Sequence, residues 1–180
     1  MQTSARVVII GGGIMGASLL YHLAELGWTD CLLIEKDELT SGSTWHAAGQ
    51  CPNITGSFNL AKIHAYSNEL YPRLEAITGQ YVSWHTSGGI RLATNERELA
   101  WLRYIHGYSK IIGFDMEIID PEKIREINPF VTTEGVIAGG WTTGDGHADP
   151  SGICNALAIG AKNMGAKIMR KNRVTGLTQL

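Results

Sequence analysis

A glycine-rich segment near the start of the chain has the residue types and spacing that bind a dinucleotide. The run Gly-Gly-Gly-Ile-Met-Gly, which begins at Gly11, satisfies the pattern G-x-G-x-x-G. In this pattern Gly11 permits a tight turn, Gly13 lets the backbone approach a pyrophosphate, and Gly16 lets a helix pack closely on a strand. The N–H groups of Ile14 and Met15 would then face the phosphates at the positive end of the helix dipole.

The elements that must position this segment are those of a β-α-β unit. The β-branched run Val7–Ile10 predicts a strand buried on both faces, and helical spacing of apolar residues predicts a helix over Ile14–Leu26. Cys31–Ile34 predicts a second strand, which Glu35 follows directly. An acid there accepts hydrogen bonds from a ribose hydroxyl, with Lys36 beside it, and repels the 2′-phosphate of NADP. This pattern leaves NAD, FAD and a turn without any ligand open.

A second segment of small and polar residues follows this unit and could line a flavin. Ala47 and Ala48 would allow the backbone to approach a flavin ring, while Ser43 and Thr44 can bind phosphate or cap a helix. His46 could polarise the ring or bond to it covalently, because neutral imidazole is a usable nucleophile. The alternative for His46 is a hydrogen-bonded loop histidine.

Composition excludes several classes of protein. The 180 residues include 15 Lys plus Arg against 17 Asp plus Glu, and 44% are hydrophobic, which excludes a disordered acidic tail and a basic nucleic-acid-binding arm. Three distant cysteines do not make a disulfide scaffold, and the scattered histidines give no metal-ligand spacing. No apolar run reaches the roughly 20 residues of a membrane helix. Few residues precede the first strand, so neither a signal nor a transit peptide is expected, and the predicted location is cytoplasmic.

The remainder of the chain predicts a mixed α+β insertion and then a return to alternating helix and strand. The fold class is α/β: a Rossmann-like, doubly wound FAD-binding sheet with an inserted mixed α+β region, incomplete in this chain. The predicted domains are residues 1–50 (dinucleotide unit and flavin loop), 51–145 (insertion) and 146–180 (return to the first domain). The further elements expected are a helix over Ile63–Ile77 bent or broken at Pro72, strands at Tyr81–His85 and Gly89–Ala93 joined by a turn, a helix over Leu99–Ile112, a strand at Met116–Ile119, a helix over Pro121–Ile127, a strand at Val136–Ala138, a helix from Asp149 to Met164, and strands at Lys167–Met169 and Val174–Leu177.

Three stretches together resemble one family of flavoproteins. They are LTSGSTWHAAG at Leu39–Gly49, GGIRLAT at Gly88–Thr94 and DGHADPSG at Asp145–Gly152. In this context they are similar to the dimethylglycine dehydrogenase and sarcosine dehydrogenase group, within the D-amino-acid-oxidase-like superfamily. The similarity covers essentially the whole chain, and the pair Trp45-His46 is its most specific element.

The resemblance implies FAD as the cofactor, attached covalently to His46 through its 8α-methyl group. It implies oxidative demethylation of an N-methylated glycine, with dimethylglycine or sarcosine as substrate. The electron acceptor stays open between oxygen and an electron-acceptor protein as a partner. The one-carbon unit would leave as formaldehyde or pass to tetrahydrofolate, which family members bind in a C-terminal region absent here. The family's catalytic residues also lie beyond Leu180, so none is assigned in this chain. The relatives have Leu after Gly49, whereas this chain continues with Gln50-Cys51-Pro52.

The implied contacts place the pyrophosphate at Ile14 and Met15, the adenosine ribose at Glu35 and Lys36, the flavin along the segment from Trp45, and adenine at the main chain of Val174. The predicted cofactor-binding residues are therefore Gly11, Gly13, Ile14, Met15, Gly16, Glu35, Lys36, Ser43, Thr44, Trp45, His46, Ala47, Ala48 and Val174. Two alternatives stay open: a noncovalent FAD-dependent amino-acid oxidase of the same superfamily, and a nucleotide-binding fragment with no activity of its own.

Overall fold

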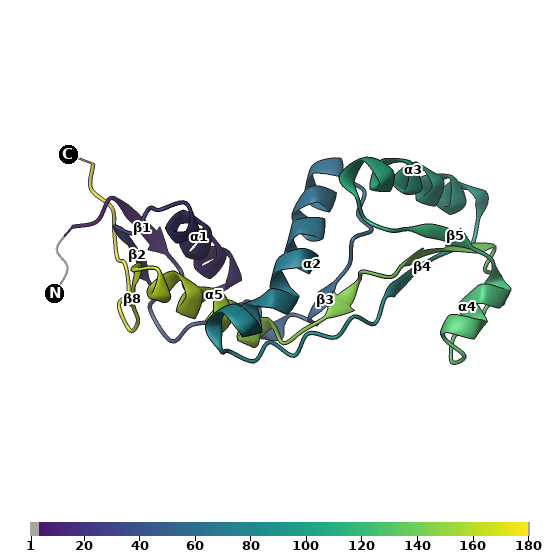
Figure 1. Cartoon of the computed structure of the whole chain (residues 1–180). Helices are drawn as coiled ribbons and strands as arrows, with labels where there is room; N and C mark the ends of the chain where they lie inside the picture. The colour runs from purple at the N-terminus through teal and green to yellow at the C-terminus, as the bar shows by residue number, and fades with distance from the viewer. Residues whose placement is uncertain (1–3, 180) are drawn as a thin grey trace. The chain divides into compact units, whose positions relative to one another are not determined.

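A computed structural model describes residues 4–179, which fold into two compact units (Figure 1). Unit 1 is made of the chain up to Gly49, Tyr71–Ser83 and the chain from Ala148 onward; unit 2 is made of Gln50–Leu70 and Trp84–His147. The sequence prediction placed residues 71–83 in the insertion, because sequence order gives no sign that the chain returns to unit 1 within a helix.

Unit 1 contains a parallel sheet with the strand order β1-β2-β8. Its strands are β1 (Val7–Ile10), β2 (Cys31–Ile34) and β8 (Lys167–Met169). Helix α1 (Ile14–Glu25) connects β1 to β2, and helix α5 (Pro150–Asn163) precedes β8. A parallel sheet with helical crossovers is the predicted Rossmann-like arrangement, and the α/β fold class is confirmed.

The two helices of unit 1 pack against each other. A Cβ at Gly160 of α5 would lie 2.6 Å from Cε2 of Tyr21 in α1, so the ring occupies the space that a side chain would fill. Helix α5 begins as predicted, with the Asp149 carboxylate accepting hydrogen bonds from the N–H groups of Ser151 and Gly152.

One face of the sheet in unit 1 is exposed at β1 but not at β2, where Cys31, Leu32 and Leu33 are all buried. Val8 and Ile10 of β1 are 48% and 55% exposed, so the prediction that this strand is buried on both faces is wrong. Right-handed crossovers that advance in one direction, β1 to β2 to β8, place both helices on the same face. A doubly wound sheet covers its second face only where the strand order reverses, and the described strands contain no reversal.

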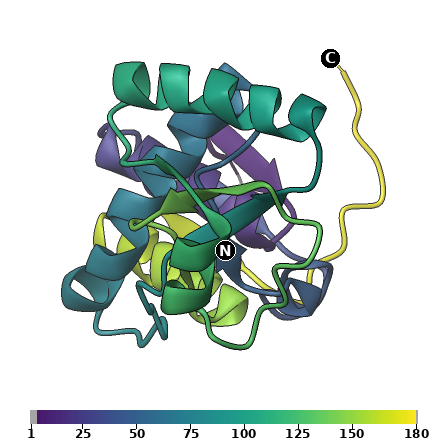
Figure 2. The same ribbon diagram turned by 90° about the vertical axis from the view of Figure 1, so that its right-hand side faces the viewer.

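Unit 2 contains an antiparallel sheet with the strand order β4-β6-β5. Its strands are β4 (Gly89–Ala93), β5 (Glu117–Ile119) and β6 (Ala138–Thr142). Helix α3 (Glu96–Ile112) lies along this sheet (Figures 1 and 2), and helix α4 (Pro121–Ile127) contacts β6.

Two glycines in β6 let side chains approach both faces of this sheet. A Cβ at Gly139 would lie 3.0 Å from Cδ1 of Ile124 in α4, and one at Gly140 would lie 2.8 Å from Cε of Met116. Leu102 of α3 approaches Gly140 from the same side as Met116. The sequence predicted a strand only at Val136–Ala138 because glycine is unfavourable in strands.

Three further elements complete the fold. The short strands β3 (Gln50–Cys51) and β7 (Gly146–His147) pair antiparallel, and the 3₁₀ helix η1 (Thr44–His46) follows β2. Helix α2 (Phe58–Thr78) begins in unit 2 and ends in unit 1. Among the described residues, no helix is long and apolar enough to cross a membrane, and no cluster of three or more His, Cys, Asp or Glu could hold a metal ion.

Helix α2 differs from its prediction in two ways. Pro72 lies inside the helix without ending it. Leu74 of the predicted apolar face is fully buried, whereas Ile63 and Tyr66 are 59% and 46% exposed. The periodic spacing therefore predicted the helix correctly but not the depth at which this face is buried.

Two predicted strands are absent. Tyr81–His85 makes only an isolated bridge, between His85 and His147, and β4 pairs with β6 instead of forming the predicted hairpin. Val174–Leu177 has no strand partner among the described residues. In both cases residue types favoured a strand, but pairing depends on segments that are distant in sequence.

A buried carboxylate in unit 2 gives this region a pH dependence. Asp145 is 5% exposed, and its Oδ1 accepts hydrogen bonds from the backbone N and the Nδ2 of Asn53, each at 2.8 Å. Burial raises the pKa of Asp145 above its usual 3.8, although hydrogen bonds from Thr142 and Asn53 act in the opposite direction. The folded state therefore binds this proton more tightly than the unfolded state.

We expect the substitution Asp145→Asn to remove this pH dependence. A raised pKa stabilises the fold most below 3.8, and this stabilisation is lost as the pH rises through the folded-state value. The free energy of unfolding of D145N minus that of the wild type should therefore increase from pH 3 to pH 7 in urea titrations. A difference that is constant or that decreases with pH would contradict the assignment.

Candidate dinucleotide-binding site

The turn between β1 and α1 is tight because of two glycines. Gly11 has a φ of 109°, in the region that favours glycine, and its N–H donates to the carbonyl oxygen of Ile34 at 2.9 Å. A Cβ at Gly16 would overlap the carbonyl oxygen of Gly11. Helix α1 can therefore begin directly against the end of β1, which brings its N-terminus to the carboxyl edge of the sheet.

The N-terminus of α1 presents backbone donors at this edge. The N-cap is Gly13, and the first helical hydrogen bond runs from Ala17 N to Gly13 O at 3.0 Å. The N–H groups of the first turn consequently have no acceptor within the helix. Ile14 N donates to Oγ1 of Thr44 at 2.9 Å, and the side chain of Met15 is 82% exposed. Such a helix end binds anions, phosphate above all.

Glu35 holds this turn from the end of β2. Glu35 is 8% exposed: its Oε2 accepts from Gly12 N at 2.6 Å, and its Oε1 accepts from Asp37 N at 2.8 Å. The sequence predicted Glu35 only as a ligand for ribose and missed this structural role. A carboxylate oxygen accepts more than one hydrogen bond, so the two backbone bonds leave capacity for a ribose hydroxyl. The side chain of Lys36 is half exposed and pairs with Asp37.

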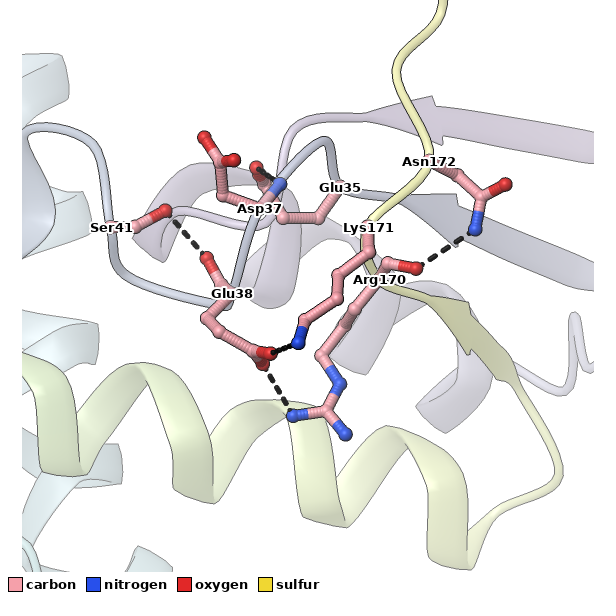
Figure 3. A network of polar contacts seen from close by, with 7 residues as sticks. All are labelled: Glu35, Asp37, Glu38, Ser41, Arg170, Lys171 and Asn172. Atoms are coloured by element: carbon pink, nitrogen blue, oxygen red, sulfur yellow. Dashed lines mark hydrogen bonds and ion pairs between the residues drawn. The ribbon is translucent and has the colours of Figure 1, made fainter.

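The loop after β8 lies beside the loop after β2 (Figure 3). Backbone hydrogen bonds join them, from Lys171 N to Asp37 O at 3.1 Å and from Asn172 N to Glu35 O at 2.9 Å. Lys171 has a φ of 57°, an uncommon value for a residue with a side chain, which the neighbouring bonds maintain. These bonds hold the carboxyl ends of two parallel strands together.

One acidic side chain reinforces the same junction. Glu38 accepts from Nη1 of Arg170 at 2.6 Å and pairs with Nζ of Lys171 at 3.3 Å (Figure 3). All three side chains are about half exposed or more, so each pair contributes little to stability. No local pattern predicts this cluster, because Glu38 and Arg170 are 132 positions apart.

The predicted adenine contact follows this loop. Val174 is half-buried and lies in no strand, a few residues beyond Asn172. Its main chain stays a predicted ligand.

The predicted flavin segment forms a short exposed turn. In η1, His46 N donates to Ser43 O and Ala47 N donates to Thr44 O, each at 3.2 Å. Thr44 is buried, whereas Trp45 is 58% exposed and its ring lies 3.8 Å from that of His46, centroid to centroid. The side chains of Ala47 and Ala48 are also exposed.

The imidazole of His46 has a defined hydrogen bond. Nδ1 lies 3.2 Å from the carbonyl oxygen of Gly42, which can only accept, so Nδ1 carries the hydrogen in this bond. In the neutral ring the lone pair is then on Nε2. His46 therefore presents a nucleophilic nitrogen from an exposed turn in unit 1.

A buried thiol packs against the backbone of the glycine turn. Sγ of Cys154 lies 3.6 Å from the carbonyl oxygen of Gly12, and burial raises the pKa of this thiol to about 11. Cys154 is therefore a neutral packing residue near pH 7 rather than a reactive one.

The site residues fit an ADP-containing dinucleotide. Gly11, Gly13, Gly16 and Glu35 are brought together at the carboxyl edge of the sheet, where a Cβ at Gly13 would lie 3.0 Å from Oγ1 of Thr44. Backbone donors with no room for side chains suit a pyrophosphate, and the acid at the end of β2 suits a ribose. The fold and this arrangement define a dinucleotide-binding protein of the Rossmann type.

Comparison with known proteins narrows this class. Residues 6–179 match the family described as FAD dependent oxidoreductase, and the chain belongs to that family. The chain is 45% identical over 173 residues to dimethylglycine dehydrogenase, mitochondrial, of Rattus norvegicus. The aligned region covers 96% of this chain and 20% of that protein. The chain is 32% identical over 178 residues to sarcosine dehydrogenase, mitochondrial, of Homo sapiens, covering 98% and 19%. The resemblance inferred from the sequence is thus confirmed.

A solved structure agrees with the fold. The crystal structure of L-proline dehydrogenase from P. horikoshii matches with a TM-score of 0.89 and 28% identity, over 99% of this chain and 47% of that one. The chain spans about a fifth of the length of the two curated relatives. Both relatives are named as mitochondrial proteins, and the cytoplasmic location expected for this chain stays a prediction.

We expect Gly16→Ala to damage both the turn and the cofactor site. The new Cβ overlaps the Gly11 carbonyl, so the free energy of unfolding should fall by about 1–3 kcal/mol. FAD affinity of the apoprotein, measured by flavin fluorescence, should fall at least about ten-fold, which corresponds to about 1.4 kcal/mol.

Gly107→Ala is the matched control, because Gly107 lies within α3 and a Cβ there meets nothing within 4 Å. It should gain about 0.5–1 kcal/mol of stability and keep its FAD affinity. Equal effects of the two substitutions would contradict the close-approach argument.

Proposed function

We propose that the protein is an FAD-dependent oxidoreductase that oxidises the N-methyl group of a methylated amine. The observation that carries this proposal is the glycine turn before α1 in unit 1. There Gly16 packs against the Gly11 carbonyl, and the Glu35 carboxylate accepts a hydrogen bond from Gly12 N. Membership of the FAD dependent oxidoreductase family favours FAD over NAD as the dinucleotide.

We propose an N-methylated glycine, dimethylglycine or sarcosine, as the substrate. The support is the 45% identity to a dimethylglycine dehydrogenase and the 32% identity to a sarcosine dehydrogenase. Oxidation removes a hydride equivalent from the N-methyl carbon and leaves an iminium, which water hydrolyses to formaldehyde and the demethylated amine. We also propose that the one-carbon unit can pass to tetrahydrofolate and that the electrons pass to an acceptor protein.

The residues of this chain bind and orient the cofactor in this proposal. The first turn of α1 holds the pyrophosphate and its negative charge through the N–H group of Met15. The N–H group of Ile14 donates to Oγ1 of Thr44, whose own hydroxyl hydrogen can be donated to a phosphate oxygen. Glu35 accepts hydrogen bonds from the ribose, and the main chain of Val174 contacts adenine. Bound FAD supplies the two-electron acceptor that amino-acid side chains lack.

We further propose that His46 carries FAD covalently. The hydrogen bond from Nδ1 to the Gly42 carbonyl leaves the lone pair on Nε2, which is the atom that bonds to the 8α-carbon. The net reaction removes one hydrogen from the imidazole and one from the 8α-methyl group. These two protons and two electrons pass to dioxygen, which is reduced to hydrogen peroxide.

We expect acid-denatured wild-type protein to retain a flavin mass on the peptide that contains His46. His46→Ala should lose this covalent flavin entirely, whereas His106→Ala, which changes a histidine of α3 in unit 2, should keep it. Mass spectrometry of tryptic peptides makes the measurement. Flavin released by acid from the wild type would contradict the covalent bond and favour a noncovalent oxidase.

A further inference from the structure

The segment that carries His46 reaches the N-terminus of α1 through one buried side chain. Of residues 41–48, only Thr44 is buried, at 7% exposed; the others are exposed. Oγ1 of Thr44 accepts the hydrogen bond of Ile14 N at 2.9 Å, and it faces Gly13 so closely that a Cβ there would lie 3.0 Å away. Thr44 therefore holds the segment against the N-terminus of α1, in addition to the hydrogen bond from Thr40 N to the Gly12 carbonyl at 3.1 Å and the contacts of η1 with α5.

Thr44 is also rigidly connected to His46. Both residues belong to η1, whose turn is closed by hydrogen bonds from His46 N to Ser43 O and from Ala47 N to Thr44 O. The imidazole is held back on the same turn by its bond to the Gly42 carbonyl. Because each link is short, the place of Thr44 against α1 sets the place of Nε2.

We propose that Thr44 is the positioning residue for covalent attachment of FAD, which joins the pyrophosphate-binding end of α1 to the nucleophilic nitrogen of His46. The proposal rests on the function proposed above and adds a residue to it. The hydroxyl accepts from Ile14 N and keeps its own hydrogen, which can be donated to a phosphate oxygen. One side chain thus fixes the distance between the bound phosphates and the nitrogen that reacts.

If Thr44 is a positioning residue, its loss should affect covalent attachment of FAD more than noncovalent binding of FAD. A purely structural role would affect both steps alike. Noncovalent binding of FAD draws on several groups, among them the glycine turn, the Met15 N–H and Glu35, and the Thr44 hydroxyl supplies only one of these contacts. The bond to His46 requires the reacting atoms to be held in a near-attack geometry, where small displacements reduce the rate by up to about 100-fold. Loss of the hydroxyl should therefore slow attachment far more than it weakens binding.

The chain offers a matched control for the loss of such a hydroxyl. Thr78, at the end of α2 in unit 1, also accepts a backbone N–H, that of Gln80 at 3.2 Å, and donates to the Leu74 carbonyl at 2.7 Å. Thr78→Val removes comparable bonds from the same unit without touching η1.

The experiment uses the complete protein, including any part outside these 180 residues, prepared without FAD. FAD is added in aerated buffer, its initial binding is followed by fluorescence, and the acid-stable flavin on the His46 peptide is followed over time by mass spectrometry. Thr44→Val should attach flavin about 10- to 100-fold more slowly than the wild type, with initial affinity changed less than about ten-fold. Thr44→Ser and Thr78→Val should attach it at close to the wild-type rate.

Two results overturn the inference while the proposed function stands. In the first, T44V attaches flavin as fast as T78V does. In the second, T44S attaches flavin as slowly as T44V does. If T44V does not fold, Thr44→Ala, which adds no bulk, gives the same comparison. A wild-type protein that binds FAD but never forms the bond overturns both the covalent attachment and the inference.

Discussion

Unit 1 depends on the absence of a side chain at Gly16. A Cβ at this position would overlap the Gly11 carbonyl, so only glycine allows α1 to start directly at the end of β1. The close approach has two consequences. The first-turn N–H groups of α1 are left at the carboxyl edge of the sheet, where they can bind a phosphate. The helix also lies close enough to the sheet for Thr44, from a distant loop, to reach Ile14 N.

Glu35 connects the predicted cofactor site to the strands that surround it through hydrogen bonds of its side chain and its backbone. The side chain binds the N–H groups of Gly12 and Asp37, while its backbone bonds to Met169 and Asn172 across the β2–β8 pair. Loops from all three parallel strands thus meet at one residue. A change at Glu35 would consequently disturb the turn that binds phosphate as well as the contact to ribose. This dual use explains why an acid predicted as a ligand is found buried.

Local signals in the sequence predicted most of unit 1 and the helices of unit 2. Glycine spacing gave the turn at Gly11, and Asp149 followed by Pro150 gave the start of α5, because caps and tight turns depend on adjacent residues. Pairing between distant segments was not predictable. β4 pairs with β6 instead of Tyr81–His85, and the contact of Glu38 with Arg170 joins loops that no local rule connects. At the site, residue identities were predictable, but the bond from Ile14 to Thr44 was not.

The measurement that tests the central claim most directly is a crystal structure of the complete protein prepared with FAD. The account predicts pyrophosphate oxygens within hydrogen-bond distance of the Met15 N–H group and of the Thr44 hydroxyl, which accepts from Ile14 N, with a ribose hydroxyl against Glu35. It also predicts continuous electron density from Nε2 of His46 to the flavin ring. A pyrophosphate bound away from the N-terminus of α1 would contradict the account.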